Sequence, residues 1–220
     1  MTPKRKLVVM GIFSALFGCQ QKTAETPALN QEEYRVTAQL NHFLRPLDRG
    51  SRYEDPLQEA LAQQGLGEVT GGGTMQRESG EIEYIDVEIS LTDLEAGAPF
   101  VISRLEEAGA PKGSLLKWHD GSKFVTVPFG KREGLGIYLD GVNLPDEVYK
   151  TSNVNTVIEE LNRRINGHGE LQGYWQGNTE TALYFYGDNA QEMAVSMKDF
   201  LDKDPLCQGS RVVTIAPKEQ

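Results

Sequence analysis

The sequence predicts an α+β protein built from two repeated halves, each with the element order β-α-β-β-α-β and an antiparallel sheet. Two pairs of motifs indicate the repeat. Residues 67–71 and 169–173 share the pattern G-E-[VL]-x-G, and each follows a stretch with helical spacing of apolar residues. Residues 113–118 (GSLLKW) and 209–215 (GSRVVTI) match in turn, each after a second amphipathic helix. Motifs repeated in the same order and context predict an internal repeat.

The first half is predicted to span residues 33–120. Apolar residues that alternate along the chain indicate its strands, and apolar residues three or four positions apart indicate its helices. The expected strands are 33–40, 66–73, 81–91 and 113–118, and the expected helices are 54–64 and 93–109.

The second half is predicted to span residues 134–217, with the same order of elements. Its expected strands are 134–141, 169–176, 180–187 and 210–217, and its expected helices are 153–166 and 188–202. Residues 121–133 are expected to link the halves, and whether this linker adds a strand of its own is left open. The element order resembles the ferredoxin-like, or split βαβ, fold.

Residues 65–74 (GLGEVTGGGT) contain five glycines, which raises the question of a phosphate site. A P-loop requires G-x-x-x-x-G-K-[ST], and no lysine lies in this stretch. A Rossmann loop follows a strand and begins a helix, whereas this stretch follows the helix expected at 54–64. We therefore predict a glycine-rich strand.

The N-terminus has the pattern of a secretory signal peptide, predicted at residues 1–18. Lys4, Arg5 and Lys6 precede an uncharged stretch at 7–17, which is the order of a positive segment and an apolar segment in such peptides. The apolar stretch is shorter than the about 20 residues that span a bilayer.

Leu16, Gly18 and Cys19 resemble the lipobox of bacterial lipoprotein precursors. The resemblance implies cleavage before Cys19, acylation of Cys19 and anchorage in the bacterial cell envelope, and Gln20 implies the outer membrane in a Gram-negative bacterium. Phe17 departs from the pattern, because that position usually holds a smaller residue, and this puts the efficiency of cleavage in question. The alternatives are ordinary secretion with cleavage elsewhere and an uncleaved anchor.

Residues 19–32 are polar and lack apolar periodicity, so we expect a flexible tether between the lipid and the folded part. The chain has two cysteines. With Cys19 acylated, Cys207 has no partner for an internal disulfide, and it is expected to be a buried packing residue.

Alternation along the strands assigns the faces of both expected sheets. The face of the first sheet that the helices leave open carries polar residues. The corresponding face of the second sheet carries Tyr138, Tyr184 and Tyr186, joined by Trp175 or Tyr174 from the neighbouring strand. Such a cluster is typical of a binding surface. Two other interpretations stay open: this face packs against the first half, or the strands are one residue out of register.

Composition and motifs favour a binding protein over an enzyme. The net charge of −10 disfavours nucleic-acid binding, which needs clustered Lys and Arg. His42, His119 and His168 are not spaced for metal binding, and no G-x-S-x-G nucleophile motif is present. No cofactor, metal or catalytic residue is therefore expected.

The sequence thus predicts a lipid-anchored envelope protein that binds another protein. An immunity-type or inhibitor protein for a secreted toxin or hydrolase is one concrete form of this hypothesis, because an acidic surface steers onto a basic enzyme cleft. The alternatives are a ligand-sensing module, a structural envelope component and, less favoured, a hydrolase with an unfamiliar site.

Overall fold

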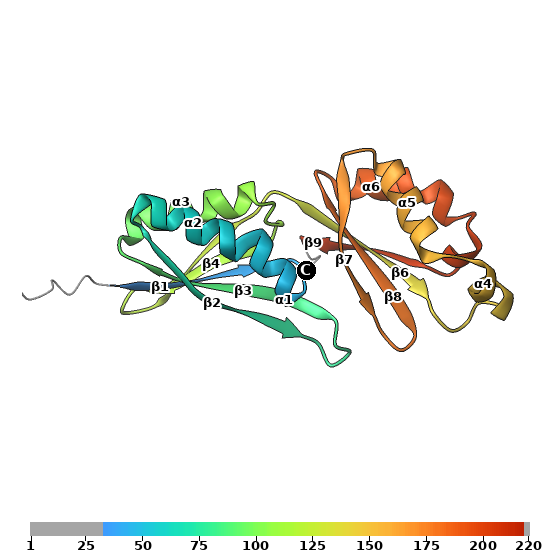
Figure 1. Cartoon of the computed structure of the whole chain (residues 1–220), viewed down its shortest axis with the longest axis horizontal. Helices are drawn as coiled ribbons and strands as arrows, with labels where there is room; N and C mark the ends of the chain where they lie inside the picture. The colour runs from blue at the N-terminus through green and yellow to red at the C-terminus, as the bar shows by residue number, and fades with distance from the viewer. Residues whose placement is uncertain (1–32, 218–220) are drawn as a thin grey trace, which may run out of the picture. The chain divides into compact units, whose positions relative to one another are not determined.

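Two antiparallel sheets, each covered on one face by helices, make up the fold (Figure 1). The computed structural model describes residues 33–217. The predicted signal peptide (1–18), the predicted tether (19–32) and Cys19 lie outside the described residues.

The first half contains a five-stranded sheet with the strand order β2-β3-β1-β4-β5. Helices α2 and α3 cover one of its faces (Figure 1). Its elements are β1 (Tyr34–Leu40), α1 (Pro46–Arg49), the π-helical turn η1 (Gly50–Glu54), α2 (Asp55–Gln64), β2 (Gly67–Gln76), β3 (Ile82–Leu91), α3 (Leu94–Glu107), β4 (Ser114–His119) and β5 (Phe124–Phe129).

The second half contains a four-stranded sheet with the order β7-β8-β6-β9. Its elements are β6 (Glu133–Asp140), α4 (Asp146–Thr151), α5 (Val154–Ile165), β7 (Gly169–Gln176), β8 (Glu180–Gly187), α6 (Ala190–Leu201), the 3-10 turn η2 (Pro205–Cys207) and β9 (Arg211–Ala216). Without β5 the two sheets have the same topology, so the prediction of two repeated ferredoxin-like halves is confirmed.

The repeat extends to a small irregularity in the sheets. Strands β2 and β7 each carry a β-bulge, between Val69 and Gly71 and between Leu171 and Gly173. In each half an amide side chain on the covering helix accepts a hydrogen bond beside the bulge. Gln58 Oε1 accepts from the Val69 backbone N–H at 2.7 Å. Asn162 Oδ1 accepts from the Leu171 N–H at 3.2 Å. A backbone donor that the bulge would leave unpaired is satisfied in the same way twice.

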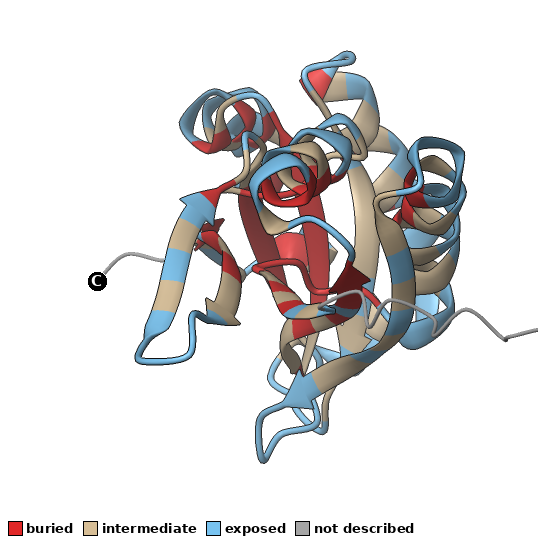
Figure 2. Ribbon diagram, turned by 90° about the vertical axis from the view of Figure 1, so that its left-hand side faces the viewer, coloured by how far each residue is buried: buried red, intermediate tan, exposed pale blue. Residues whose placement is uncertain are grey.

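Each half has its own apolar core between its helices and its sheet. Buried residues concentrate on the strands beneath the helices (Figure 2). In the first core Leu57, Leu61 and Val101 pack onto the sheet, and in the second Leu161, Ile165 and Met197 do so. Cys207 is buried in the second core, as predicted.

The glycine-rich stretch forms β2, which confirms that it is a strand. Its glycines leave room for an ion pair between Arg49 and Glu54 on the helix-covered face. Arg49 Nη1 donates to the Gly73 carbonyl at 2.7 Å. A Cβ on Gly72 would lie 2.5 Å from a Glu54 carboxylate oxygen, so a larger residue would displace the pair.

Residues 121–133, expected to link the halves, do contain a strand, the point that the sequence left open. Residues 124–129 form β5, which pairs with β4 and extends the first sheet. The alternation of Val125, Val127 and Phe129 explains this, because these side chains turn to the helix-covered face while the residues between them turn away. Only residues 130–132 separate β5 from β6.

Candidate functional site

The aromatic face predicted as a binding surface lies buried between the two halves. Tyr138, Tyr184 and Tyr186 are 6%, 1% and 1% exposed, in a cluster that includes Phe43 of the first half. Trp175 packs against the same cluster and is half-buried. The interpretation of this face as an external binding surface is therefore wrong. The alternative, packing against the first half, is correct.

A carboxylate from the first half holds two of the tyrosines. Glu81, which immediately precedes β3, is buried. Its Oε1 accepts hydrogen bonds from the hydroxyls of Tyr138 (2.6 Å) and Tyr184 (2.7 Å). Its Oε2 lies 3.1 Å from Arg77. Burial, and secondarily the hydrogen bond to Glu81, raises the pKa of both tyrosines above its ordinary value.

The segment after β1 makes the second contact between the halves. The Phe43 N–H donates to the Tyr186 hydroxyl at 3.0 Å, and Asn41 Nδ2 donates to the Ile215 carbonyl at 3.1 Å. His42 is fully buried, with its Nδ1 2.7 Å from the Tyr53 hydroxyl. Burial, with the nearby charge of Arg52, keeps the pKa of His42 well below its usual range. The hydrogen bonds of Phe43 and Asn41 join the two halves, whereas that of His42 lies within the first half.

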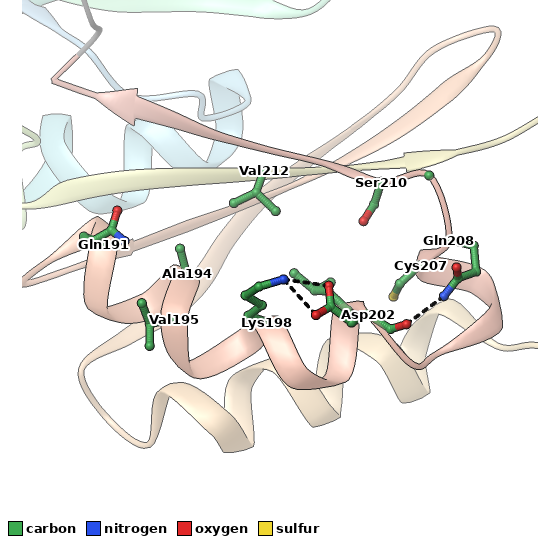
Figure 3. Close-up of a pocket in the computed structure, with 11 residues that line it drawn as sticks. Gln191, Ala194, Val195, Lys198, Asp202, Cys207, Gln208, Ser210 and Val212 are labelled. Carbon is green, nitrogen blue, oxygen red and sulfur yellow. Dashed lines mark hydrogen bonds and ion pairs between the residues drawn. The ribbon is translucent and has the colours of Figure 1, made fainter.

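A groove between α6 and β9 is the open site that best fits a binding protein. It has a volume of about 520 Å³, and Figure 3 shows its lining. On the helix side lie Ala194, Val195 and Lys198, and on the strand side lie Ser210 and Val212. Val195 and Val212 are 63% and 44% exposed. An exposed apolar lining beside a strand edge favours a polypeptide ligand.

Strand β9 positions the groove because it forms one edge of the second sheet. Pairing with β6 places Val212 opposite Ile137, whose side chain is in the second core. Val212 therefore points to the helix-covered side of the sheet. There α6 ends in a turn through η2, and Leu201 and Cys207 close the far end of the groove.

The ionisable groups of the groove are paired or uncharged. Lys198 Nζ lies 2.7 Å from Asp202 on the next turn of helix. Gln208 Nε2 donates to the Asp202 carbonyl at 3.0 Å. Burial, and then the charge of Asp204, raises the pKa of the Cys207 thiol to about 12. The thiol is thus protonated at neutral pH, which makes it a packing group and not a nucleophile.

The sequence did not reveal this groove. Cys207 was expected to be buried, but nothing placed it beside Val195 and Val212. A comparison of the two repeats could have pointed to it. Residues 124–129, which follow GSLLKW at 113–118, alternate like a strand, and no such segment follows GSRVVTI at 209–215.

A further hollow of about 500 Å³ lies at the N-terminal end of α5 and is lined by Tyr149, Ile158 and Tyr174, among others. Tyr174, the other aromatic considered for the predicted binding face, is exposed there. Within residues 33–217 no group of three or more His, Cys, Asp or Glu side chains could hold a metal ion. No helix in that range is long and apolar enough to cross a bilayer.

No protein-family model and no curated protein matches the chain. Solved structures with some similarity include an unknown protein from Galdieria sulphuraria, 12% identical over 83% of this chain and 98% of that chain, with a TM-score of 0.26. The first two RRM domains of a yeast poly(U)-binding protein are 12% identical over 82% of this chain and 99% of theirs, with a TM-score of 0.23. A candidate monooxygenase from Lactobacillus acidophilus NCFM is 10% identical over 83% and 92%, with a TM-score of 0.28. Likenesses this weak carry no argument about function.

Proposed function

We propose that the chain is a bacterial envelope lipoprotein, anchored through acylated Cys19, whose folded part binds another protein through the groove between α6 and β9. The observation that carries the binding function is the exposed apolar lining of this groove beside the edge strand β9. The lipobox-like residues Leu16–Cys19 support the anchor.

The ionisable groups in and around the second half favour binding over catalysis. A general acid or base must reach the reacting group. Glu81 is buried and hydrogen-bonded to Tyr138 of the second half, and His42 is buried and hydrogen-bonded to Tyr53 of its own half. The interface is filled by side chains such as Phe43 and Tyr184, which also disfavours a ligand-sensing cavity between the halves.

Within the binding class, we favour an immunity-type or inhibitor protein for a secreted toxin or hydrolase. The net charge of −10 supports a basic partner, because opposite net charges speed encounter and suppress wrong partners. A structural role in the envelope is the alternative, and it predicts a partner in the envelope itself.

The anchor is tested by growing a bacterium that expresses the chain with an alkyne-tagged palmitate. The expected result is label on the wild-type protein in the membrane fraction, with neither label nor membrane association for Cys19→Ser. If the wild type takes up no label and the wild type and Cys19→Ser associate equally with the membrane, the result would contradict lipidation and favour an uncleaved anchor.

The binding function is tested with a photo-reactive amino acid in living cells. Placed at Val195, in the groove, it should cross-link a discrete protein. Placed at Val142, an exposed valine outside the groove, it should not cross-link that protein. Equal cross-linking from both positions, or none from Val195 at full expression in the native host, would overturn the assignment of the groove.

A further inference from the structure

We propose that the groove receives an extended segment of the partner protein as a fifth strand of the second sheet, antiparallel to β9, with alternate apolar side chains in the groove and a basic residue beside Asp202. This inference rests on the proposed function and adds the chemistry of the partner. Its evidence is the chain's own first half, in which β5 occupies the corresponding place.

The internal repeat aligns the two edges residue by residue. Asp93 caps α3 and Asn189 caps α6, each by accepting a hydrogen bond from the backbone N–H three residues on. Gly113 and Gly209 precede β4 and β9 with positive φ angles of 83° and 73°. The spacing from cap to glycine is the same in both halves, so each residue of α6 and β9 has a defined counterpart in α3 and β4.

In the first half β5 covers the edge of β4. Leu116 lies opposite Val127, and Ser114 lies opposite Phe129, which is buried in the first core. The counterpart of Leu116 is Val212. Leu116 is fully buried, at 0% exposure, whereas Val212 is 44% exposed. The second half therefore keeps an apolar position for a fifth strand and leaves it uncovered.

The helices beside the two edges are also alike. Ala98 and Leu105 of α3 correspond to Ala194 and Leu201 of α6, and the latter two line the groove. The place of Phe129 would lie opposite Ser210, at the end of the groove that Leu201 and Cys207 close. An aromatic or large aliphatic side chain of the partner fits this end.

In the first half a carboxylate on α3 binds the residues that immediately follow β5. Glu106 of α3 accepts from the Gly130 N–H at 3.1 Å and lies 2.8 Å from Lys131 Nζ, the two residues that follow β5. Its counterpart is Asp202, which immediately follows α6 and lines the groove. Within the described residues the Asp202 carboxylate forms an ion pair with Lys198 of α6, and such an exposed pair contributes little to stability. A basic residue after the incoming strand completes the arrangement of the first half.

Strand addition suits this site physically. An edge strand presents backbone N–H and C=O groups on the side away from its neighbour, and an added strand pairs with them while alternate side chains fill the groove. The template is β5 and the residues that flank it, SKFVTVPFGK at 122–131.

The probe is therefore a synthetic peptide of residues 122–131. It is titrated into the chain from residue 19 onward, carrying Cys19→Ser, and backbone amide shifts are followed by NMR. We expect shifts concentrated in β9 and α6, with slowed amide exchange in β9. A Val127→Asp peptide should bind about 30-fold more weakly, because its carboxylate would enter the groove unpaired. The Thr126→Asp peptide, whose changed side chain turns away from the groove, should lose less than about threefold.

Protein variants give the matching test. Val212→Asp should weaken the peptide about 30-fold, whereas Val142→Asp, at an exposed valine elsewhere, should change its affinity less than about twofold. Asp202→Lys should weaken the wild-type peptide about threefold or more, and a Lys131→Glu peptide should recover the loss with that variant. Unchanged amide shifts outside the groove would show that the variants fold.

The outcomes separate this inference from the proposed function. Failure of the peptide to bind at millimolar concentration, or shifts away from β9, would overturn strand addition, while cross-linking from Val195 would still support a binding protein. Peptide binding without any cross-linked protein in cells would support the strand site and overturn the proposed function. The same shifts on concentrating the protein alone would identify a second copy as the occupant and overturn the partner assignment.

Discussion

The two sheets share one topology apart from β5, but the face that the helices leave open is polar in the first sheet and apolar and buried in the second. In the first half this face carries Arg35, Thr37 and Glu88, and Lys117 hydrogen-bonds Gln39 across its strands at 2.9 Å. In the second half it carries Tyr138, Tyr184 and Tyr186, which are buried. The backbone plan is thus compatible with a polar face or an apolar one. The residues that alternate outward decide which of the two must be covered.

The edges of the sheets at β4 and β9 differ in the opposite way, since here it is the first half that is covered and the second that is open. The first sheet covers the edge of β4 with β5, whereas the second leaves β9 open beside an apolar groove. One half therefore supplies its own fifth strand and uses its surface to cover the other half. The other half gives up its open face and retains a free edge.

The largest expected effect comes from breaking the covered face. Tyr186→Ala removes a ring that lies 4.1 Å from the His42 ring, centroid to centroid, and with it the hydroxyl that accepts a hydrogen bond from the Phe43 N–H. We expect the free energy of unfolding to fall by about 3–5 kcal/mol in urea denaturation. Tyr174→Ala, on the same sheet but exposed, should cost less than about 1 kcal/mol. Similar losses for both would contradict the burial of this face.

The covered edge of the first sheet is tested by two phenylalanines on one strand. Phe129→Ala should cost about 3 kcal/mol of unfolding free energy, because the side chain is buried against the first core. Phe124→Ala should cost less than about 0.5 kcal/mol, since Phe124 is exposed at the other end of β5. If the two variants were equally stable, β5 would not act as a packed strand and the template for the second edge would fail.

The burial of Tyr138 and Tyr184, together with their hydrogen bonds to Glu81, predicts that the stability of the fold depends on pH. The folded pKa values of Tyr138 and Tyr184 lie above the ordinary 10.0. Their contribution is fully present below pH 10 and is lost as the pH rises above it, because the unfolded chain releases these protons first. We expect unfolding free energy to fall by up to about 1.4 kcal/mol per pH unit for each such tyrosine.

The double variant Tyr138→Phe/Tyr184→Phe should have a shallower loss of stability between pH 10 and 11 in urea denaturation. The comparison with wild type removes the contributions of lysines and of the unchanged tyrosines. Parallel pH profiles for wild type and variant would exclude these two hydroxyls as the cause.

The smallest expected effect tests whether the two repeats are equivalent at their β-bulges. Gln58→Ala and Asn162→Ala each leave one backbone N–H beside a bulge without its side-chain acceptor. Each should lower the free energy of unfolding by about 1 kcal/mol, by similar amounts. Gln63→Ala, at an exposed position on α2, is the control and should cost less than about 0.5 kcal/mol. A cost at one bulge only would show that the two amides are not equivalent.

The sequence predicted most of the fold because the signal is local. Alternation and helical spacing located every strand of the two repeats, and they placed Tyr138, Tyr184 and Tyr186 together on one face. Packing of that face against the first half was one of the interpretations left open, but the covering residues could not be predicted, because Glu81 and the segment 41–43 lie far away in the sequence and carry no pattern of their own. Residues 124–129 alternate like a strand, but alternation alone does not show which strand they pair with, so the contrast between the edges of β4 and β9 is visible only in the structure.

The contacts of Glu81 and Phe43 also have a consequence for the order in which the parts of the chain are synthesised. The residues that cover the second sheet are made before that sheet is, since they precede it in the sequence. When the second half emerges during synthesis, the acceptor and the apolar neighbour of its tyrosines have therefore already been made. A nick at residues 130–132, followed by separation of the halves, would release a fragment with both an uncovered aromatic face and a free strand edge, and each of these features promotes aggregation.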